Sequence, residues 1–254
     1  MTHLSVGLLL LAHLAVAKEP ASDPEDQPPA PASEREVSWK TIVPNILSDQ
    51  KRIWLFPAKL GQGKNWIPTA AVLGMTAGLV GADPPIASYF RRTTSYHRFN
   101  QVFTSNATAI GTFAVPASLY IAGQVRKDSR MKATALLAGE AVANAEIVTS
   151  VLKGATRRVR PADVPLHGNF SDTWWDSKGA FHGGFTSGHA IAAFSVATVI
   201  SRRYGKHRWV PYVAYGLAGA VSISRMTLSA HFASDVFMGG ALGYSIGRFA
   251  VLRE

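Results

Sequence analysis

The chain has 254 residues, of which 47% are hydrophobic, and a formal net charge of +10 at neutral pH. This length is enough for one large core and does not require a second catalytic domain. The lack of cysteine excludes disulfides and thiolate metal sites, and it is compatible with an oxidising compartment.

Residues 1–17 have the pattern of a secretory signal peptide. Their apolar stretch ends in Ala15-Val16-Ala17, the small-x-small sequence that signal peptidases accept. The segment lacks the Lys or Arg that usually stands near the start of a signal, so an uncleaved membrane anchor is the alternative. We expect an exported protein with a mature N-terminus at Lys18, either periplasmic or associated with the extracytoplasmic side of a membrane.

The next segment, residues 18–45, is rich in Pro, Ala, Ser and acidic side chains and has too little apolar surface to fold. We predict a disordered tether here, followed by one helical domain over residues 46–254. Residues 41–254 carry 23 basic and 10 acidic side chains, a net charge of +13. This surplus favours phosphorylated substrates and anionic lipid headgroups, and because no recognised nucleic-acid motif is present we expect no nucleic acid partner.

The apolar segments of this domain have helical composition, with many Ala, Leu and Gly residues and no sustained alternation of apolar and polar positions. The sequence therefore predicts an all-α fold. Six helices are expected, approximately from Ile67 to Gly81, Phe99 to Gly123, Met131 to Lys153, Gly188 to Tyr204, Trp209 to Ile223 and Ala233 to Ala250. Most are shorter than the roughly 20 apolar residues that span a bilayer, so both a soluble and a membrane-integral bundle stay open.

The longest irregular stretch, residues 161–186, lies between the third and fourth predicted helices. Long loops of this kind often shape a functional site. Its His167 and His182 match no zinc spacing, so we expect neither a metal nor another cofactor. Trp174 and Trp175 are expected to pack the loop, with substrate stacking and a membrane interface as alternatives.

Three polar clusters flank the predicted helices and contain the residues that chemistry needs. In chain order they are Lys153 with Arg160-Pro161, then Thr186-Ser187-Gly188-His189, then Ser224-Arg225 with His231 and Asp235. Each alone has an ordinary explanation, as cations at a helix end, a helix cap or an i, i+4 polar pair. The third fixes four residue types at about 5% frequency each, so coincidence is a poor explanation for the ordered set.

Together the clusters resemble the three signature motifs of the type 2 phosphatidic acid phosphatase family. This family shares its site with bacterial nonspecific acid phosphatases and vanadium haloperoxidases. The resemblance covers residues 153–235 by motif and implies a six-helix core bundle with its active site at helix ends. One position departs from the pattern, because Thr186 stands where the family usually has proline. A threonine hydroxyl can cap the same turn, so we expect function to survive.

The resemblance implies that His231 is the nucleophile of a metal-independent phosphatase that forms a phosphohistidine. Asp235 is then expected to accept the other N–H of His231 and to fix its tautomer. His189 is expected to be the general acid that protonates the leaving oxygen and later the base that activates water. The substrate can be a lipid phosphate, an isoprenoid pyrophosphate or a small soluble ester.

The phosphate-binding residues implied by the same motifs are Lys153, Arg160, Ser187, Gly188 and Arg225. Three fixed cations and a helix start can stabilise the charge that spreads over a phosphoryl group in transfer, without a metal ion. Two other functions are kept as alternatives. One is a vanadium-dependent haloperoxidase, and the other is a non-catalytic protein that binds polyanions at a membrane surface.

Overall fold

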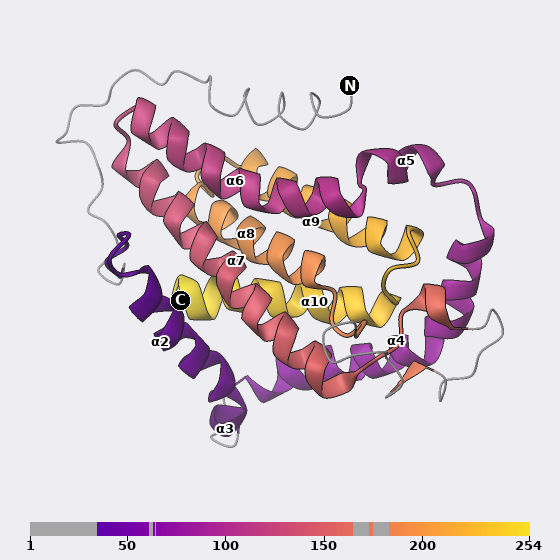
Figure 1. The fold of residues 1–254 in the computed structure, drawn as a ribbon. Helices are drawn as coiled ribbons and strands as arrows, with labels where there is room; N and C mark the ends of the chain where they lie inside the picture. The colour runs from indigo at the N-terminus through magenta and orange to yellow at the C-terminus, as the bar shows by residue number, and fades with distance from the viewer. Residues whose placement is uncertain (1–34, 61–62, 64, 165–172, 175–182) are drawn as a thin grey trace.

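The structure is a computed structural model that describes residues 35–60, 63, 65–164, 173–174 and 183–254. Regular structure in these residues is helical throughout, which confirms the predicted all-α fold (Figure 1). The α-helices are α2 (Ile42–Trp54), α3 (Phe56–Leu60), α4 (Trp66–Arg92), α5 (His97–Val102), α6 (Ser105–Val125), α7 (Ser129–Thr156), α8 (Gly188–Arg203), α9 (Trp209–Thr227) and α10 (Ala233–Ser245). They are joined by a short 3₁₀-helix η2 (Pro161–Asp163) and a π-helix η4 (Ile246–Val251). The predicted signal peptide and most of the predicted tether lie outside the described residues.

All six predicted helices are present, and three of them differ in extent. The last one ends as an α-helix at Ser245 instead of Ala250 and continues as the π-helix η4. Helix α4 continues to Arg92 instead of ending at Gly81, passing through Pro84 and Pro85. The predicted second helix is divided into α5 and α6, because the Thr104 hydroxyl accepts a hydrogen bond from the Ala107 N–H at 3.1 Å and so begins a new helix.

Helix α8 is the centre of the bundle and packs against α6, α7, α9 and α10 (Figure 1). Its Ile191, Val196 and Val199 are buried in one core cluster with apolar residues of α7. Helix α10 approaches α8 closely because Gly243 has no side chain, and a Cβ atom there would collide with the Ile191 carbonyl oxygen. The lack of a side chain at Gly243 therefore allows the backbones of α8 and α10 to pack in close contact.

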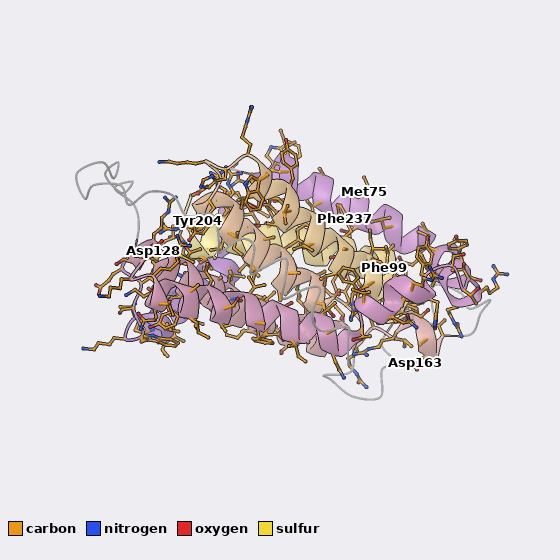
Figure 2. The ribbon with its side chains drawn as sticks, turned by 90° about the horizontal axis from the view of Figure 1, so that it is seen from above. Met75, Phe99, Asp128, Asp163, Tyr204 and Phe237 are labelled. Atoms are coloured by element: carbon orange, nitrogen blue, oxygen red, sulfur yellow. The ribbon has the colours of Figure 1, made fainter. Side chains whose placement is uncertain are left out.

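The ends of five helices meet at one end of the bundle. Figure 2 shows Asp128 and Tyr204 at one end and Phe99 and Asp163 at the opposite end. At the Phe99 end α6, α8 and α10 begin, and α7 and α9 end, as hydrogen bonds between these termini show. The active site implied by the motifs was expected at helix ends, and all three motifs lie at this end.

The structure moves the start of the folded domain toward the N-terminus, because part of the predicted tether is structured. Helix α2 begins at Ile42, and the Arg35 guanidinium forms ion pairs with Asp49 of α2 and Glu140 of α7. Both carboxylates are fully buried, and Asn144 donates a hydrogen bond to Asp49 at 3.1 Å. Composition could not predict the contacts of Arg35 with Glu140 and of Asp49 with Asn144, because each joins residues about 100 positions apart in the chain.

We expect Arg35→Ala to destabilise the domain, because it leaves the buried carboxylate of Glu140 without its cation and Asp49 with only the more distant Arg253, at 3.7 Å. Breaking a buried ion pair by removing one partner costs about 3–5 kcal/mol. Thermal unfolding of the detergent-purified protein should show a clearly lowered Tm. The control is Arg52→Ala in exposed α2, where only a 3.4 Å hydrogen bond to the Phe249 carbonyl is lost. Equal Tm values for the two variants would contradict this role of Arg35.

Three helical segments are long and apolar enough to cross a membrane, namely Trp66–Arg92, Ser105–Val125 and Ser129–Asp163. In the first two, only 11% and 22% of the most apolar stretch is buried inside the protein. Large apolar side chains such as Leu73, Met75 and Phe113 are exposed on them, and Met75 is labelled on α4 in Figure 2. These helices reach the length of roughly 20 apolar residues that spans a bilayer, and they give the chain the character of a membrane-associated protein.

Candidate active site

The three motifs converge at the end of the bundle described above. The Ser187 N–H at the start of α8 donates to the Asp235 carbonyl in α10, at 3.2 Å. His189 contacts the first residue of α6, and Arg225 near the end of α9 contacts the same residue, Ser105. Four helices thus bring residues up to 130 positions apart in the chain into one site.

His231 is buried in the loop between α9 and α10, with 5% of its side chain exposed. Its Nδ1 lies 2.7 Å from the Gly184 carbonyl oxygen. Since a carbonyl can only accept, Nδ1 carries the proton and Nε2 keeps its lone pair. Burial lowers the pKa of His231 below its ordinary value, although Asp235 opposes this shift, so the ring is neutral at pH 7. A neutral imidazole with a free Nε2 is suited to nucleophilic attack.

The expected pairing of His231 with Asp235 is looser than predicted. Asp235 Oδ2 lies 3.8 Å from His231 Nδ1, and the Gly184 carbonyl is the nearer acceptor. Asp235 Oδ2 accepts the Phe232 N–H at 2.8 Å instead, which caps α10. The carboxylate therefore acts on His231 mainly through its charge, while the tautomer is fixed by a backbone group that no sequence pattern identifies.

His189 lies in the first turn of α8, and its Nε2 is 3.1 Å from the Ser105 carbonyl oxygen. The same reasoning places a proton on Nε2 and leaves Nδ1 for a ligand. Burial lowers the pKa of His189 to about 4, with the positive charge of Arg225 as the next cause and smaller contributions from His231 and Lys153. These charge effects show that the motif residues lie within electrostatic reach of one another.

Arg225 is almost fully buried and is held by the junction between α5 and α6. Its guanidinium donates to Ser105 Oγ at 3.0 Å and to the Phe103 carbonyl at 2.7 Å. Lys153 and Arg160 lie within electrostatic reach of this site, since the positive charge of each lowers the pKa of His231. The three cations predicted to bind phosphate are thus grouped near the two histidines, as an anion site requires.

Ser187 is the N-cap of α8, where its hydroxyl accepts from the Ala190 N–H at 3.4 Å. Gly188 lies against α7, and a Cβ there would be 3.0 Å from Thr149 Cγ2. Thr186 is fully buried, but its hydroxyl has no hydrogen-bond partner within the described part of the chain. The expected capping by Thr186 is therefore wrong, because Ser187 occupies the cap position.

Two charged residues at the site were not identified from the sequence. Arg158 is one of three arginines that follow Lys153 in the sequence, and it is completely buried and pairs with both Asp83 of α4 and Asp235 of α10. Asp83 precedes Pro84-Pro85, where the predicted helix had already ended. A carboxylate inside an otherwise apolar segment is the only signal that the sequence offers for it.

The irregular loop is described only in part. His167, His182 and Trp175 lie outside the described residues. Trp174 covers Arg158, with the guanidinium 4.6 Å from the ring centroid, and it contacts Phe185. Trp174 therefore packs against the site, in line with the expected packing role.

Comparison with known proteins supports the resemblance. Residues 134–253 match the model of the PAP2 superfamily. Two Porphyromonas gingivalis proteins are similar, a lipid A 1-phosphatase (38% identity over 64 residues, 25% of this chain) and a lipid A 4'-phosphatase (27% over 104 residues, 41% of this chain). The aligned regions span only 14% and 43% of those relatives.

A solved structure, a transmembrane PAP2-type phosphatidylglycerolphosphate phosphatase from Bacillus subtilis, aligns with a TM-score of 0.48 and 20% identity, over 71% of this chain and 92% of that one. All three motifs fall inside the region that matches the family model. Residues 134–253 of this chain match the PAP2 superfamily, the family that the motifs resemble.

Proposed function

We propose that this protein is a membrane-associated phosphatase that hydrolyses lipid phosphate esters through a phosphohistidine on His231. The observation that supports this most strongly is the convergence of two differently oriented histidines with three cations at one end of an apolar bundle. A site of this composition stabilises a phosphoryl group by fixed charge and needs no metal ion.

In the proposed reaction Lys153, Arg160 and Arg225 bind the phosphate oxygens. Nε2 of His231 attacks phosphorus, and the bond from phosphorus to the ester oxygen breaks. The ester oxygen takes a proton from Nδ1 of His189 as it leaves. Water then attacks the phosphohistidine, its proton passes to His189, and inorganic phosphate departs.

The low pKa of His189 requires an explanation, because a general acid must be protonated. The value of about 4 applies to a site that holds only cations and neutral groups around the ring. A bound phosphate brings negative charge among Arg225 and Lys153 and so favours the protonated imidazole. Substrate binding is therefore expected to charge His189, which leaves the acid ready only when an ester is present.

A lipid substrate is supported by an apolar groove beside the site. The groove has a volume of about 270 Å³ and lies between α5 and α9, lined by Tyr96, Phe99, Gly216, Gly219, Ala220 and Ile223. Helix α9, which lines the groove, also carries Arg225, and Arg225 donates to the Phe103 carbonyl just after α5, so the groove and the phosphate site share these two elements. An acyl chain can lie in it while the phosphate reaches His231. The similar Porphyromonas gingivalis proteins are lipid A phosphatases, which agrees with this substrate class.

The test compares a long-chain lipid monophosphate with p-nitrophenyl phosphate, using detergent-purified protein in EDTA. We expect phosphate release from both, a higher kcat/KM for the lipid, and inhibition by vanadate, which mimics the trigonal transition state. Activity that disappears in EDTA and returns with Mg²⁺ or Zn²⁺ would contradict the mechanism. A preference for the soluble ester would contradict the lipid substrate, and bromide oxidation with vanadate would favour the haloperoxidase alternative.

Filling the groove should separate the two substrates. Gly219→Leu introduces a side chain where a Cβ atom has no neighbour within 4 Å, so the fold should tolerate it. We expect kcat/KM for the long-chain lipid to fall about 10-fold or more, with little change for p-nitrophenyl phosphate. Gly74→Leu on exposed α4, which is equally unobstructed, is the matched control. Equal effects on both substrates would show that the groove does not hold the lipid chain.

We also propose that the chain is exported and acts on the extracytoplasmic side of the membrane, as its signal sequence predicts. The long apolar helices support membrane association. Labelling of intact cells with a membrane-impermeant reagent, directed at a cysteine introduced near the site, should reach the protein from outside. Labelling only after lysis would place the site in the cytoplasm.

A further inference from the structure

A buried ion network lies directly behind His231 and is used by no step described so far. The Arg158 guanidinium donates to Asp83 Oδ2 at 2.6 Å, to Asp235 Oδ1 at 2.5 Å and to Ser234 Oγ at 2.7 Å. All four side chains are at most 1% exposed. Ser234 also bonds Asp83 through its N–H, at 3.1 Å, and through its hydroxyl. Asp83 of α4 is thus linked to the first turn of α10.

Arg158 reaches both acceptors of His231 by separate routes. Its guanidinium holds Asp235, and its backbone carbonyl accepts the Gly184 N–H at 2.6 Å. The Gly184 carbonyl in turn accepts from His231 Nδ1 at 2.7 Å. Aromatic rings enclose the guanidinium, with Phe232 at 4.3 Å and Trp174 at 4.6 Å. The cation cannot move away from Asp235 without breaking this enclosure.

The charges of this network do not cancel. Two carboxylates face one guanidinium, so with both carboxylates ionised the network carries one net negative charge while His231 is neutral. If Asp83 were absent, Arg158 and Asp235 would form a neutral pair, and Asp235 would have no charge to spare for the imidazole. Attack on phosphorus makes the His231 ring cationic, and a nearby net negative charge stabilises that form in a low-dielectric site.

We propose that Asp83 and Arg158 are positioning residues for His231, in which Arg158 holds Asp235 and Gly184 in place and Asp83 balances the charge of Arg158. The negative charge of Asp235 is thereby kept available for the imidazolium that forms during catalysis. This inference rests on the proposed function, since it assigns roles within the same site. It gives α4, which precedes the three motifs by about 60 residues or more, a part in positioning the nucleophile.

The expected pH effect follows from the groups that face His231. Asp235 favours its charged form, while Lys153 and Arg160 oppose it, and His189 adds a further positive group when protonated. Asp83→Asn removes one negative charge behind this set, which lowers the pKa of His231 further. Because the nucleophile must be neutral, the acid limb of kcat/KM should move to lower pH, by about 0.5 to 1 unit. At the same time kcat should fall about 10-fold to 100-fold, because the imidazolium is less stable.

The matched control is Ser234→Ala, which breaks hydrogen bonds in the same network without changing its charge. This variant should have a lower Tm, but the acid limb of its kcat/KM profile should lie at the same pH as in the wild type. Arg158→Met should move the limb the opposite way, to higher pH, because it leaves two carboxylates behind His231. Folding of each variant is checked by its thermal melting curve.

The decisive variant is the double replacement Asp83→Asn with Arg158→Met, which restores one net negative charge on Asp235. We expect its acid limb to return toward that of the wild type and its kcat to exceed that of Asp83→Asn. An unmoved limb in Asp83→Asn overturns the inference, as does a double variant no better than the single one. If Arg158→Met does not fold, the inference is tested by comparing the acid limb of kcat/KM in Asp83→Asn with that in Ser234→Ala. A wild-type protein without phosphatase activity instead overturns the proposed function.

Discussion

Replacing His231 with alanine is expected to abolish phosphoenzyme formation and turnover for every phosphate ester, whatever its leaving group. The buried ring donates its Nδ1 proton to the Gly184 carbonyl, which leaves the lone pair of Nε2 for the proposed attack. Within the part of the chain that the structure describes, the other nitrogen groups that act on the two histidines are the side chains of Lys153, Arg160 and Arg225, which are assigned to phosphate binding. Removing a nucleophile lowers kcat by about 10⁴-fold or more.

The measurement is rapid-quench detection of acid-labile, base-stable phosphoprotein together with steady-state release of phosphate. Both should be lost in His231→Ala, while the protein still binds vanadate or phosphate through its cations. His207→Ala is a suitable control, because this histidine lies in the turn before α9, away from the motifs. A phosphoenzyme that persists in His231→Ala would show that another side chain is the nucleophile.

The sequence predicts the positions of the catalytic groups better than their contacts. Lys153, His189, Arg225 and His231 are found together because each belongs to a motif with fixed spacing. The acceptor that fixes His231 is a backbone carbonyl, which any residue type can provide. A carbonyl leaves no trace in composition or spacing, so this contact required the structure.

The sequence also did not predict the ion pairs between residues that lie far apart in the chain. Arg158 and Arg160 are neighbours of the same type in the first motif, yet only Arg158 is fully buried. Its burial depends on Asp83, which is 75 positions away on a helix that appeared to end before it. The same is true of Arg35 and Glu140, which are 105 positions apart. Local periodicity predicts helices well, but it carries no information about which distant charges will meet.

Replacing His189 with alanine is expected to separate the two chemical steps. Attack by His231 does not need His189 when the leaving oxygen departs unaided, as p-nitrophenolate does. His189→Ala should therefore keep a phosphoenzyme burst with p-nitrophenyl phosphate but lose about 10²-fold to 10⁴-fold in rate with alkyl phosphates. Steady-state turnover should be slow for both, because no base activates water for hydrolysis of the phosphohistidine.

The pH dependence supplies a second, independent measurement. Burial and Arg225 lower the pKa of His189 to about 4 in the free enzyme, so the acid form at neutral pH depends on the bound phosphate. In the wild type the kcat for alkyl phosphates should fall as pH rises and the bound His189 loses its proton. This alkaline decline should be absent from the burst rate of His189→Ala with p-nitrophenyl phosphate. If instead His189→Ala lost the burst while His231→Ala kept it, the roles of the two histidines would be exchanged.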